Sequence, residues 1–364
     1  MEKGKITNLF PGGNTAQGFY SFYEYLPYKA ERIFIIKGGP GTGKSTFMKK
    51  IGKIMVEEGF NIEYHWCSSD NNSLDGLVIK ELNVAFLDGT APHLVDPKTP
   101  GVIDEIINLG RYWDSQLLQN SKERIQELNN KIWSSFQDAY KYLAIAKLTH
   151  DEWESYYIEA MDFQQANQKT ANLITEIIGD KAIAKKPGEI RRLFASALTP
   201  QGPVDYLANI TADVKTRYII NGKPGTGKAT LTKKIAEAAL QRGYDVQFYH
   251  CSFDPESIDT IVIPELSVAV IDGTAPHEIN PASEDDKVIN MLDCIEQKTI
   301  TEFESDISDV KERYNKLMSK AIAKIAKAKE LHDDLEEYYI EAMDFESIDQ
   351  LMQEIVSDLL SKTD

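Results

Sequence analysis

The chain has 364 residues and a formal net charge of −17 at pH 7. No basic run or stripe is visible, so binding of nucleic acid or of an anionic membrane surface is not expected. Three cysteines without a C-x-x-C spacing indicate neither a disulfide framework nor a zinc site. Without a signal peptide or an apolar stretch long enough to span a bilayer, a soluble cytoplasmic protein is expected.

A strand, a glycine-rich turn and a helix are predicted in succession. Residues 32–36 form a short apolar run rich in β-branched side chains, which predicts a buried strand, and residues 46–55 have helical apolar spacing. Between them lies GGPGTGKS, residues 38–45, here called the first glycine loop. It fits the pattern G-x-x-x-x-G-K-[ST] completely, in the strand-to-helix context that the pattern requires.

The first glycine loop has the chemistry of a phosphate site. Glycines let backbone N–H groups curve around a phosphate where a Cβ would obstruct the turn, and the helix start adds unpaired N–H groups and a positive dipole end. We expect Lys44 to reach the β- and γ-phosphates and the Ser45 hydroxyl to ligate Mg²⁺.

A second acidic ligand is predicted at the end of a neighbouring strand. After a strand at 61–67, residues 83–88 give four apolar positions followed by Asp88, whose carboxylate would hold Mg²⁺ through water. His93 would sense the γ-phosphate or orient water, or else is a loop histidine bonded to backbone, and Thr90 has similar standing.

The segment between these two strands offers another carboxylate. Asp70 lies where a kinase would place its substrate, and it would accept the proton of a substrate hydroxyl. Ser73 and Asp75 are instead expected to cap a short helix that follows.

The chain is a tandem duplication. Residues 184 positions apart match over long stretches, as in the segment DGTAPH at 88–93 and again at 272–277. The first glycine loop recurs as GKPGTGKA, residues 222–229, here called the second glycine loop. Its last residue, Ala229, cannot ligate metal, and Thr230 stands one position too late to replace the hydroxyl.

Each repeat is predicted to join a nucleotide-binding sheet to a helical arm. The expected α/β fold has two parallel sheets flanked by helices, with domains at 1–186 (sheet about 1–100, arm about 101–180) and 187–364 (sheet about 188–282, arm about 283–360). In the arms, residues 111–178 and 282–364 contain no Gly or Pro, and the arm of the second repeat shows a helical seam with coiled-coil spacing. They either pack on their own sheets or pair, for self-association, for a protein partner or to transmit a nucleotide-driven motion.

One octapeptide, YYIEAMDF, occurs unaltered in both arms, at 156–163 and 338–345. Identity between the repeats indicates a shared constraint. The sequence leaves open whether that constraint is packing, ligand contact or contact between the halves.

These motifs resemble those of the P-loop NTPase superfamily, and the doubled layout is similar to a group of poorly characterised bacterial ATPase-like proteins. The resemblance implies ATP or GTP binding with Mg²⁺, with Lys44 as the phosphate lysine and Ser45 and Asp88 as metal ligands. The catalytic candidates are Lys44 and Asp88, together with His93 and Asp70, which are proposed from their positions in the sequence. The candidate nucleotide-binding residues are Gly38, Gly39, Pro40, Gly41, Thr42, Gly43, Lys44, Ser45, Thr46, Gly222, Gly225, Thr226, Gly227, Lys228, Ala229 and Thr230.

The expected function is Mg²⁺-dependent ATP hydrolysis at the first glycine loop, with a degenerate second site. The sequence does not give the base specificity: ATP is preferred over GTP only because it is the commoner ligand, and no guanine-reading Asn-Lys-x-Asp segment occurs. Gly89 and Gly273 stand where many ATPases have a water-activating Glu after the strand-end Asp. The alternatives are a small-molecule kinase that uses Asp70 as base, and a nucleotide-sensing scaffold that acts through its arms.

Overall fold

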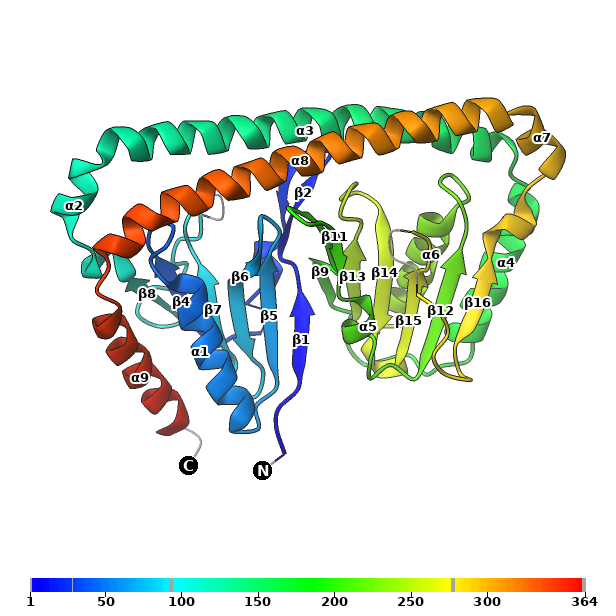
Figure 1. Ribbon diagram of the computed structural model, residues 1–364. Coiled ribbons are helices and arrows are strands. Elements are labelled where there is room, and N and C mark those ends of the chain that lie inside the picture. Colours follow the sequence, from blue (N-terminus) through cyan, green and yellow to red (C-terminus); the bar gives the residue numbers. More distant parts are fainter. Residues whose placement is uncertain (1, 28, 92–93, 276–278, 362–364) are drawn as a thin grey trace.

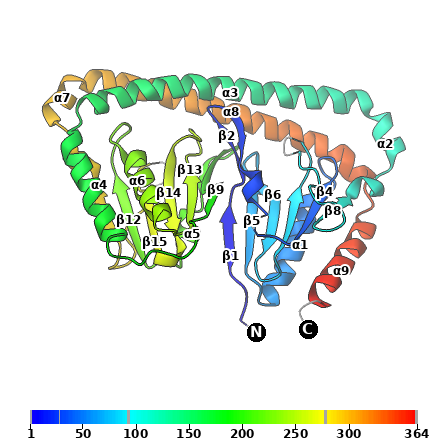
Figure 2. The same ribbon diagram turned by 180° about the vertical axis from the view of Figure 1, so that it is seen from behind.

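The computed structural model describes residues 2–27, 29–91, 94–275 and 279–361. Within these residues the protein is mixed α/β, with two six-stranded sheets side by side and two long helices that bridge them (Figures 1 and 2). The strand order is β1-β5-β6-β7-β4-β8 in one sheet and β9-β13-β14-β15-β12-β16 in the other, so the two sheets share one topology.

The strands of the first repeat are β1 (Ile6–Leu9), β2 (Gly12–Thr15), β3 (Gly18–Ser21), β4 (Arg32–Lys37), β5 (Ile62–Cys67), β6 (Asp70–Ile79), β7 (Val84–Asp88) and β8 (Asp104–Asn108). Its helices are α1 (Lys44–Glu57), α2 (Ser115–Asn120), α3 (Lys122–Glu159) and α4 (Phe163–Ile177), with 3₁₀ turns η1 (Tyr23–Tyr25) and η2 (Leu109–Tyr112).

The strands of the second repeat are β9 (Ile190–Phe194), β10 (Ser196–Thr199), β11 (Gly202–Asp205), β12 (Thr216–Asn221), β13 (Val246–His250), β14 (Ile258–Ile263), β15 (Val268–Asp272) and β16 (Lys287–Asn290). Its helices are α5 (Leu207–Ile210), α6 (Lys228–Gln241), α7 (Gln297–Glu302), α8 (Glu304–Ala342) and α9 (Phe345–Ser361), with 3₁₀ turns η3 (Pro264–Leu266) and η4 (Met291–Cys294).

Both sheets are mixed, which corrects the prediction of parallel sheets. Strand β6 runs antiparallel to both of its neighbours, β5 and β7, and β14 does the same between β13 and β15. The helix expected after Ser73 and Asp75 is wrong, because these residues belong to β6. A tight turn after Cys67 folds the chain back as a hairpin, and pairing on both sides holds the apolar end of β6 in the sheet.

Each sheet is one strand wider than the boundaries in the sequence suggested. Strands β8 and β16 pair in parallel with β4 and β12, although both fall in segments that we assigned to the helical arms. Each of these strands is short and has little apolar periodicity of its own. The sequence analysis therefore assigned its residues to the helical pattern that follows.

The arms cross from one repeat to the other. Helix α3 starts beside the first sheet and ends beside the second, and α8 runs the opposite way along it (Figures 1 and 2). At their middle the fully buried side chains of Ala139, Leu143, Ala321 and Ile325 bring the helices together. The arms therefore pair with one another within a single chain.

The final helix of each arm completes the core of the opposite repeat. Apolar side chains of α9, among them Ile348 and Met352, pack with Phe47 of α1 and Phe86 of the first sheet. In the same way α4 packs against α6 and the second sheet through Leu173 and Ile177. Each sheet thus buries one face under two helices, one from its own repeat and one from the other.

A buried ion pair joins β9, the edge strand of the second sheet, to β5, which lies next to the edge strand β1 in the first sheet. The guanidinium of Arg191 on β9 donates two hydrogen bonds to the Glu63 carboxylate on β5, at 3.0 and 2.7 Å. Both side chains are less than a tenth exposed. Burial alone would raise the pKa of Glu63, but Arg191, a hydrogen bond with His65 and the charge of Lys80 outweigh burial and hold that pKa well below its usual 4.5.

No helix of the described residues is both long and apolar enough to cross a membrane.

Replacing Arg191 with alanine should lower the free energy of unfolding by about 3–5 kcal/mol, because Glu63 would be left buried without its partner. The matched control is Lys5→Ala, which removes an exposed ion pair with Asp213 that also links the two repeats and should lower the free energy by at most about 1 kcal/mol. Urea denaturation measures both. Equal losses in the two variants would contradict the assignment of the buried pair as the joint between the sheets.

The contribution of Glu63 should depend on pH. A carboxyl whose pKa is lower in the folded than in the unfolded chain stabilises the fold above the unfolded pKa, and loses that effect as pH falls through the folded value. The difference in unfolding free energy between wild type and Glu63→Gln should therefore be largest at neutral pH and shrink well below pH 4.5. A difference that stays constant over that range would show that the charge of Glu63 does not stabilise the fold.

Candidate functional site

The first glycine loop leaves β4 and enters α1 through left-handed backbone. Gly41 and Gly43 have φ of 68° and 86°, and α1 begins at Lys44. Only glycine adopts these angles without strain. Thr42 closes the turn, since its hydroxyl donates to the carbonyl of Gly39 at 2.8 Å. The loop therefore ends directly at the N-terminus of a long helix, where backbone N–H groups have no partner inside the helix.

Three of the predicted site residues converge at this loop. The Lys44 ammonium donates to the carbonyls of Gly38 and Gly39, at 3.1 and 2.8 Å, and lies 3.5 Å from the Asp88 carboxylate. The Ser45 hydroxyl accepts the backbone N–H of Leu74 at 2.9 Å. Strand β7 runs beside β4, so Asp88 emerges next to the loop. The ammonium, the hydroxyl and the carboxylate thus lie around one helix start.

Thr90 ties the segment after β7 to the loop. Its hydroxyl donates to the Gly38 carbonyl at 2.9 Å and its N–H to Asp88 at 2.9 Å. The other predicted residue of this segment, His93, lies outside the described residues. Pro40 is part-buried within the loop, whereas Thr46 and Thr230 are exposed on the first turns of α1 and α6.

Asp70 is engaged by the arm of the second repeat. Its carboxylate accepts the N–H of Asn72 and the hydroxyl of Ser73, at 2.9 and 2.8 Å, and lies 3.2 Å from the ammonium of Lys329 on α8. Burial would raise the pKa of Asp70, but these hydrogen bonds and the Lys329 charge bring it below its ordinary value. Asp70 is therefore a weaker base than a free aspartate.

A residue that the sequence did not reveal as part of the site is Asp75. Gly76 on β6 pairs with Leu87 on β7, and the two strands are antiparallel. Asp75 and Asp88, the next residues in each direction, therefore lie opposite one another. Burial, and next the charge of Asp88, raise the pKa of Asp75 to about 8. In the second repeat Asp259 faces Asp272, and the same two causes raise its pKa to about 7. The recurrence of Asp75 in both repeats was the only signal in the sequence.

The second glycine loop repeats this geometry without the serine hydroxyl. Gly225 and Gly227 have φ of 78° and 80°, and α6 begins at Lys228. The Lys228 ammonium lies 3.6 Å from Asp272. Thr226 donates to Lys223 and Thr274 to Gly222, as their counterparts do in the first loop. Ala229 stands in the position of Ser45, so one of the expected metal ligands is missing here.

Helix α8 lies directly on the first glycine loop. A Cβ added to Gly39 would be 2.6 Å from Cε1 of Tyr339, and one added to Gly41 would be 2.7 Å from the backbone oxygen of Glu336. The Glu336 carboxylate also accepts the N–H of Gly41, at 3.2 Å. The absence of side chains at both glycines therefore lets the arm approach.

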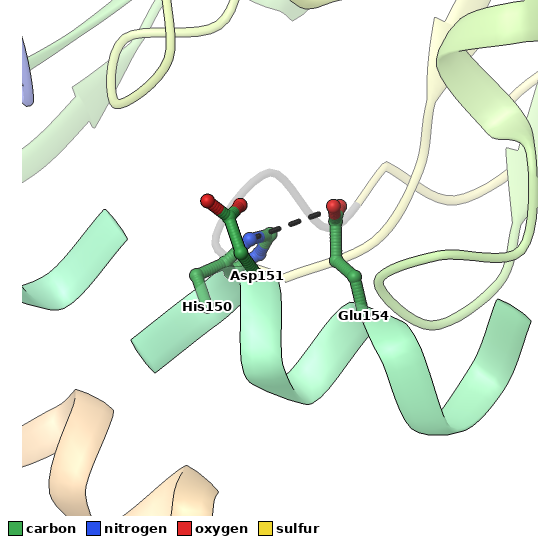
Figure 3. A group of neighbouring side chains, drawn as sticks. All are labelled: His150, Asp151 and Glu154. Carbon is green, nitrogen blue, oxygen red and sulfur yellow. Dashed lines mark ion pairs between the residues drawn. The ribbon is translucent and has the colours of Figure 1, made fainter. Parts of the chain in front are cut away.

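Helix α3 meets the second loop in the same way. A Cβ on Gly225 would lie 2.4 Å from the backbone oxygen of Glu154. Next to it on α3, His150 lies 3.7 Å from the Glu154 carboxylate, and Asp151 completes a group of possible metal ligands (Figure 3). The arm that reaches the first loop carries the equivalent group, His332, Asp333 and Glu336.

In both groups the aspartate already pairs with a lysine, which competes with a cation for that carboxylate. Asp151 pairs with Lys147, and Asp333 pairs with Lys329. Burial, and then the charge of Lys147, lower the pKa of His150 to about 4, so its imidazole is neutral at physiological pH.

In both repeats the octapeptide contacts the opposite half of the chain. Its backbone pairs with the segment after the last strand of the opposite sheet, where Asp114 N–H donates to Ala342 and Asp344 N–H to Tyr112, both at 2.8 Å. The equivalent bonds at the second sheet join Glu296 to Ala160 and Asp162 to Cys294. Asp344 and Asp162 then bond to the N–H groups of the first turns of α9 and α4.

The sequence predicted the strand–loop–helix residues but missed the residues that come from the opposite arm. Tyr339 and its counterpart Tyr157 were visible only as part of the identical octapeptide, and Glu336 and Glu154, two residues before it, were not singled out.

Comparison of the chain with protein-family models, with curated proteins and with solved structures gives no match.

The contact between α8 and the first loop can be tested with paired glycine substitutions. Gly41→Ala should lower the free energy of unfolding by more than Gly101→Ala, because both residues have positive φ (68° and 74°) but a Cβ meets nothing within 4 Å at Gly101. Left-handed backbone alone costs about 1–2 kcal/mol for alanine. A larger decrease in the free energy of unfolding therefore measures the steric clash with Glu336. Urea denaturation gives both values, and equal losses would show that α8 does not press on the loop.

Proposed function

We propose that the chain is a nucleotide-binding protein that hydrolyses ATP with Mg²⁺ at the first glycine loop and carries a degenerate site at the second. The observation that supports it best is the convergence of Lys44, Ser45 and Asp88 at the start of α1. A lysine ammonium, free helix N–H groups and hard oxygen ligands are the groups that a magnesium-bound triphosphate needs.

The residues present fit Mg²⁺ at the first loop better than at the second. The Ser45 hydroxyl and the Asp88 carboxylate would hold the ion, with Asp75 as a second carboxyl group beside Asp88. When bound, Mg²⁺ would neutralise charge that develops on the phosphates. In the second repeat Asp272 and Lys228 persist, but Ala229 offers no ligand, which supports an unequal pair of sites.

The chain's own groups would act mainly by positioning and by electrostatics. Lys44 lies beside the loop carbonyls, from which its flexible side chain can turn to a β- or γ-phosphate oxygen. The N–H groups at the start of α1 are held in place by the helix and would stabilise charge on the phosphate oxygens. Such preorganised electrostatic stabilisation is the main source of catalysis in phosphoryl transfer. Thr90 fixes the segment that follows Asp88 against the loop.

The kinase alternative receives less support. It needs Asp70 as a base, and the Asp70 carboxylate is already held by Ser73, Asn72 and Lys329. Its lowered pKa weakens it further as a proton acceptor. We therefore place Asp70 in the contact between the first sheet and α8.

The asymmetry of the sites predicts unequal effects of two lysine substitutions. Lys44→Ala should lower ATP turnover by about a hundredfold or more, since it removes a cation aimed at the transferred phosphate. Lys228→Ala should lower turnover much less. Phosphate release by the purified variants, after circular dichroism has confirmed folding, measures both. Equal losses, or turnover that survives Lys44→Ala, would contradict the assignment of the first loop as the hydrolytic site.

A further inference from the structure

The carboxylate of Glu336, on α8, is hydrogen-bonded to the backbone of the first glycine loop. Its Oε1 atom accepts the N–H of Gly41 at 3.2 Å. Gly41 lies inside the loop pattern, at a position whose N–H groups cradle phosphate oxygens when such a loop holds a nucleotide. A carboxylate oxygen and a phosphate oxygen are both anionic acceptors, so they compete for one donor.

The backbone of the arm also limits the space above the loop. The Glu336 Cα and carbonyl oxygen would lie 3.2 and 2.7 Å from a Cβ at Gly41, and the Tyr339 ring covers Gly39. Tyr339 in turn packs edge-on against Trp113, with ring centroids 6.0 Å apart. A triphosphate that reaches the Gly41 N–H therefore has to move both the carboxylate and the helix turn that carries it.

We propose that Glu336 is a built-in competitor of the nucleotide phosphates at the first glycine loop, and that nucleotide binding displaces this end of α8 from the loop. The proposal rests on the proposed function, because it takes a nucleoside triphosphate as the ligand. It adds a residue from the opposite repeat to the site and makes the arm the element that responds to binding.

The displacement has a path to the second repeat. Helix α8 is continuous from Glu304 to Ala342 and packs along α3, whose own Glu154 lies on the second glycine loop. Ion pairs between the arms, Arg313 with Glu152 and Lys324 with Asp138, add to the buried seam. A shift of α8 at the first loop thus changes the packing of the helix that covers the second loop.

The test measures ATP affinity at the first loop alone. All variants carry Lys228→Ala to weaken the second site, and Mg²⁺-ATP is titrated by calorimetry into this parent, into the parent with Glu336→Gln, and into the parent with Glu337→Gln. Glu337 is the next residue of α8 and is exposed, so it controls for the loss of one negative charge. Glutamine keeps the shape of glutamate, which preserves the helix packing.

Glu336→Gln should tighten ATP binding by about threefold to tenfold, because the neutral amide competes less well for the Gly41 N–H and does not repel the phosphates. Glu337→Gln should leave the affinity unchanged. ATP binding that is equal or weaker in Glu336→Gln would overturn the proposal while leaving the nucleotide site intact. Absence of ATP binding in all three proteins would overturn the proposed function, and the competitor role with it.

Hydrogen exchange gives a second readout in the parent protein. Saturating Mg²⁺-ATP should speed exchange of the backbone amides of residues 332–343, because that end of α8 leaves the loop. Unchanged or slower exchange in this segment would contradict displacement even if Glu336→Gln tightens binding.

Discussion

The packing of each long arm onto the glycine loop of the opposite repeat is the constraint on which the structure depends. The first glycine loop needs glycine at 39 and 41 because Tyr339 and Glu336 approach its backbone closely there. The same crossing carries α9 and α4 to the sheets whose cores they complete. Separating the arms would therefore expose apolar faces in both halves and uncover both glycine loops.

The two halves differ at a few residues of the glycine loops and of the contact between the sheets. Ser45 gives the first loop a hydroxyl that Ala229 lacks in the second, whereas Lys44 and Lys228, with their strand-end aspartates, are equivalent. Between the sheets the Glu63–Arg191 pair is also one-sided, because the equivalent positions are Gln247 and Thr7. Both halves of the duplicated chain therefore have the same architecture, but only the first has the full set of candidate site residues, which includes Ser45. We interpret the second glycine loop as a packing surface for α3, which lies against it at Gly225.

Much of the fold could be predicted from local pattern. The strands β4, β5 and β7, the start of α1 and the long helices follow from apolar runs, glycine spacing and the absence of Gly and Pro. The antiparallel β6 and the edge strands β8 and β16 could not, because their pairing is decided by neighbours far along the chain. The crossing was hidden by the duplication itself, since an arm that fits one sheet fits the other. Helix length was the available clue: the 38 residues of α3 span about 57 Å, roughly twice a small domain.

The most direct test of the account is an experimental structure of the chain with Mg²⁺ and a non-hydrolysable ATP analogue. The account predicts phosphate density along the N–H groups from Gly41 to Ser45, a metal ion beside Ser45 and Asp88, and the Glu336 carboxylate withdrawn from Gly41. A nucleotide bound elsewhere, or a Glu336 carboxylate still hydrogen-bonded to Gly41 beneath a bound triphosphate, would contradict it.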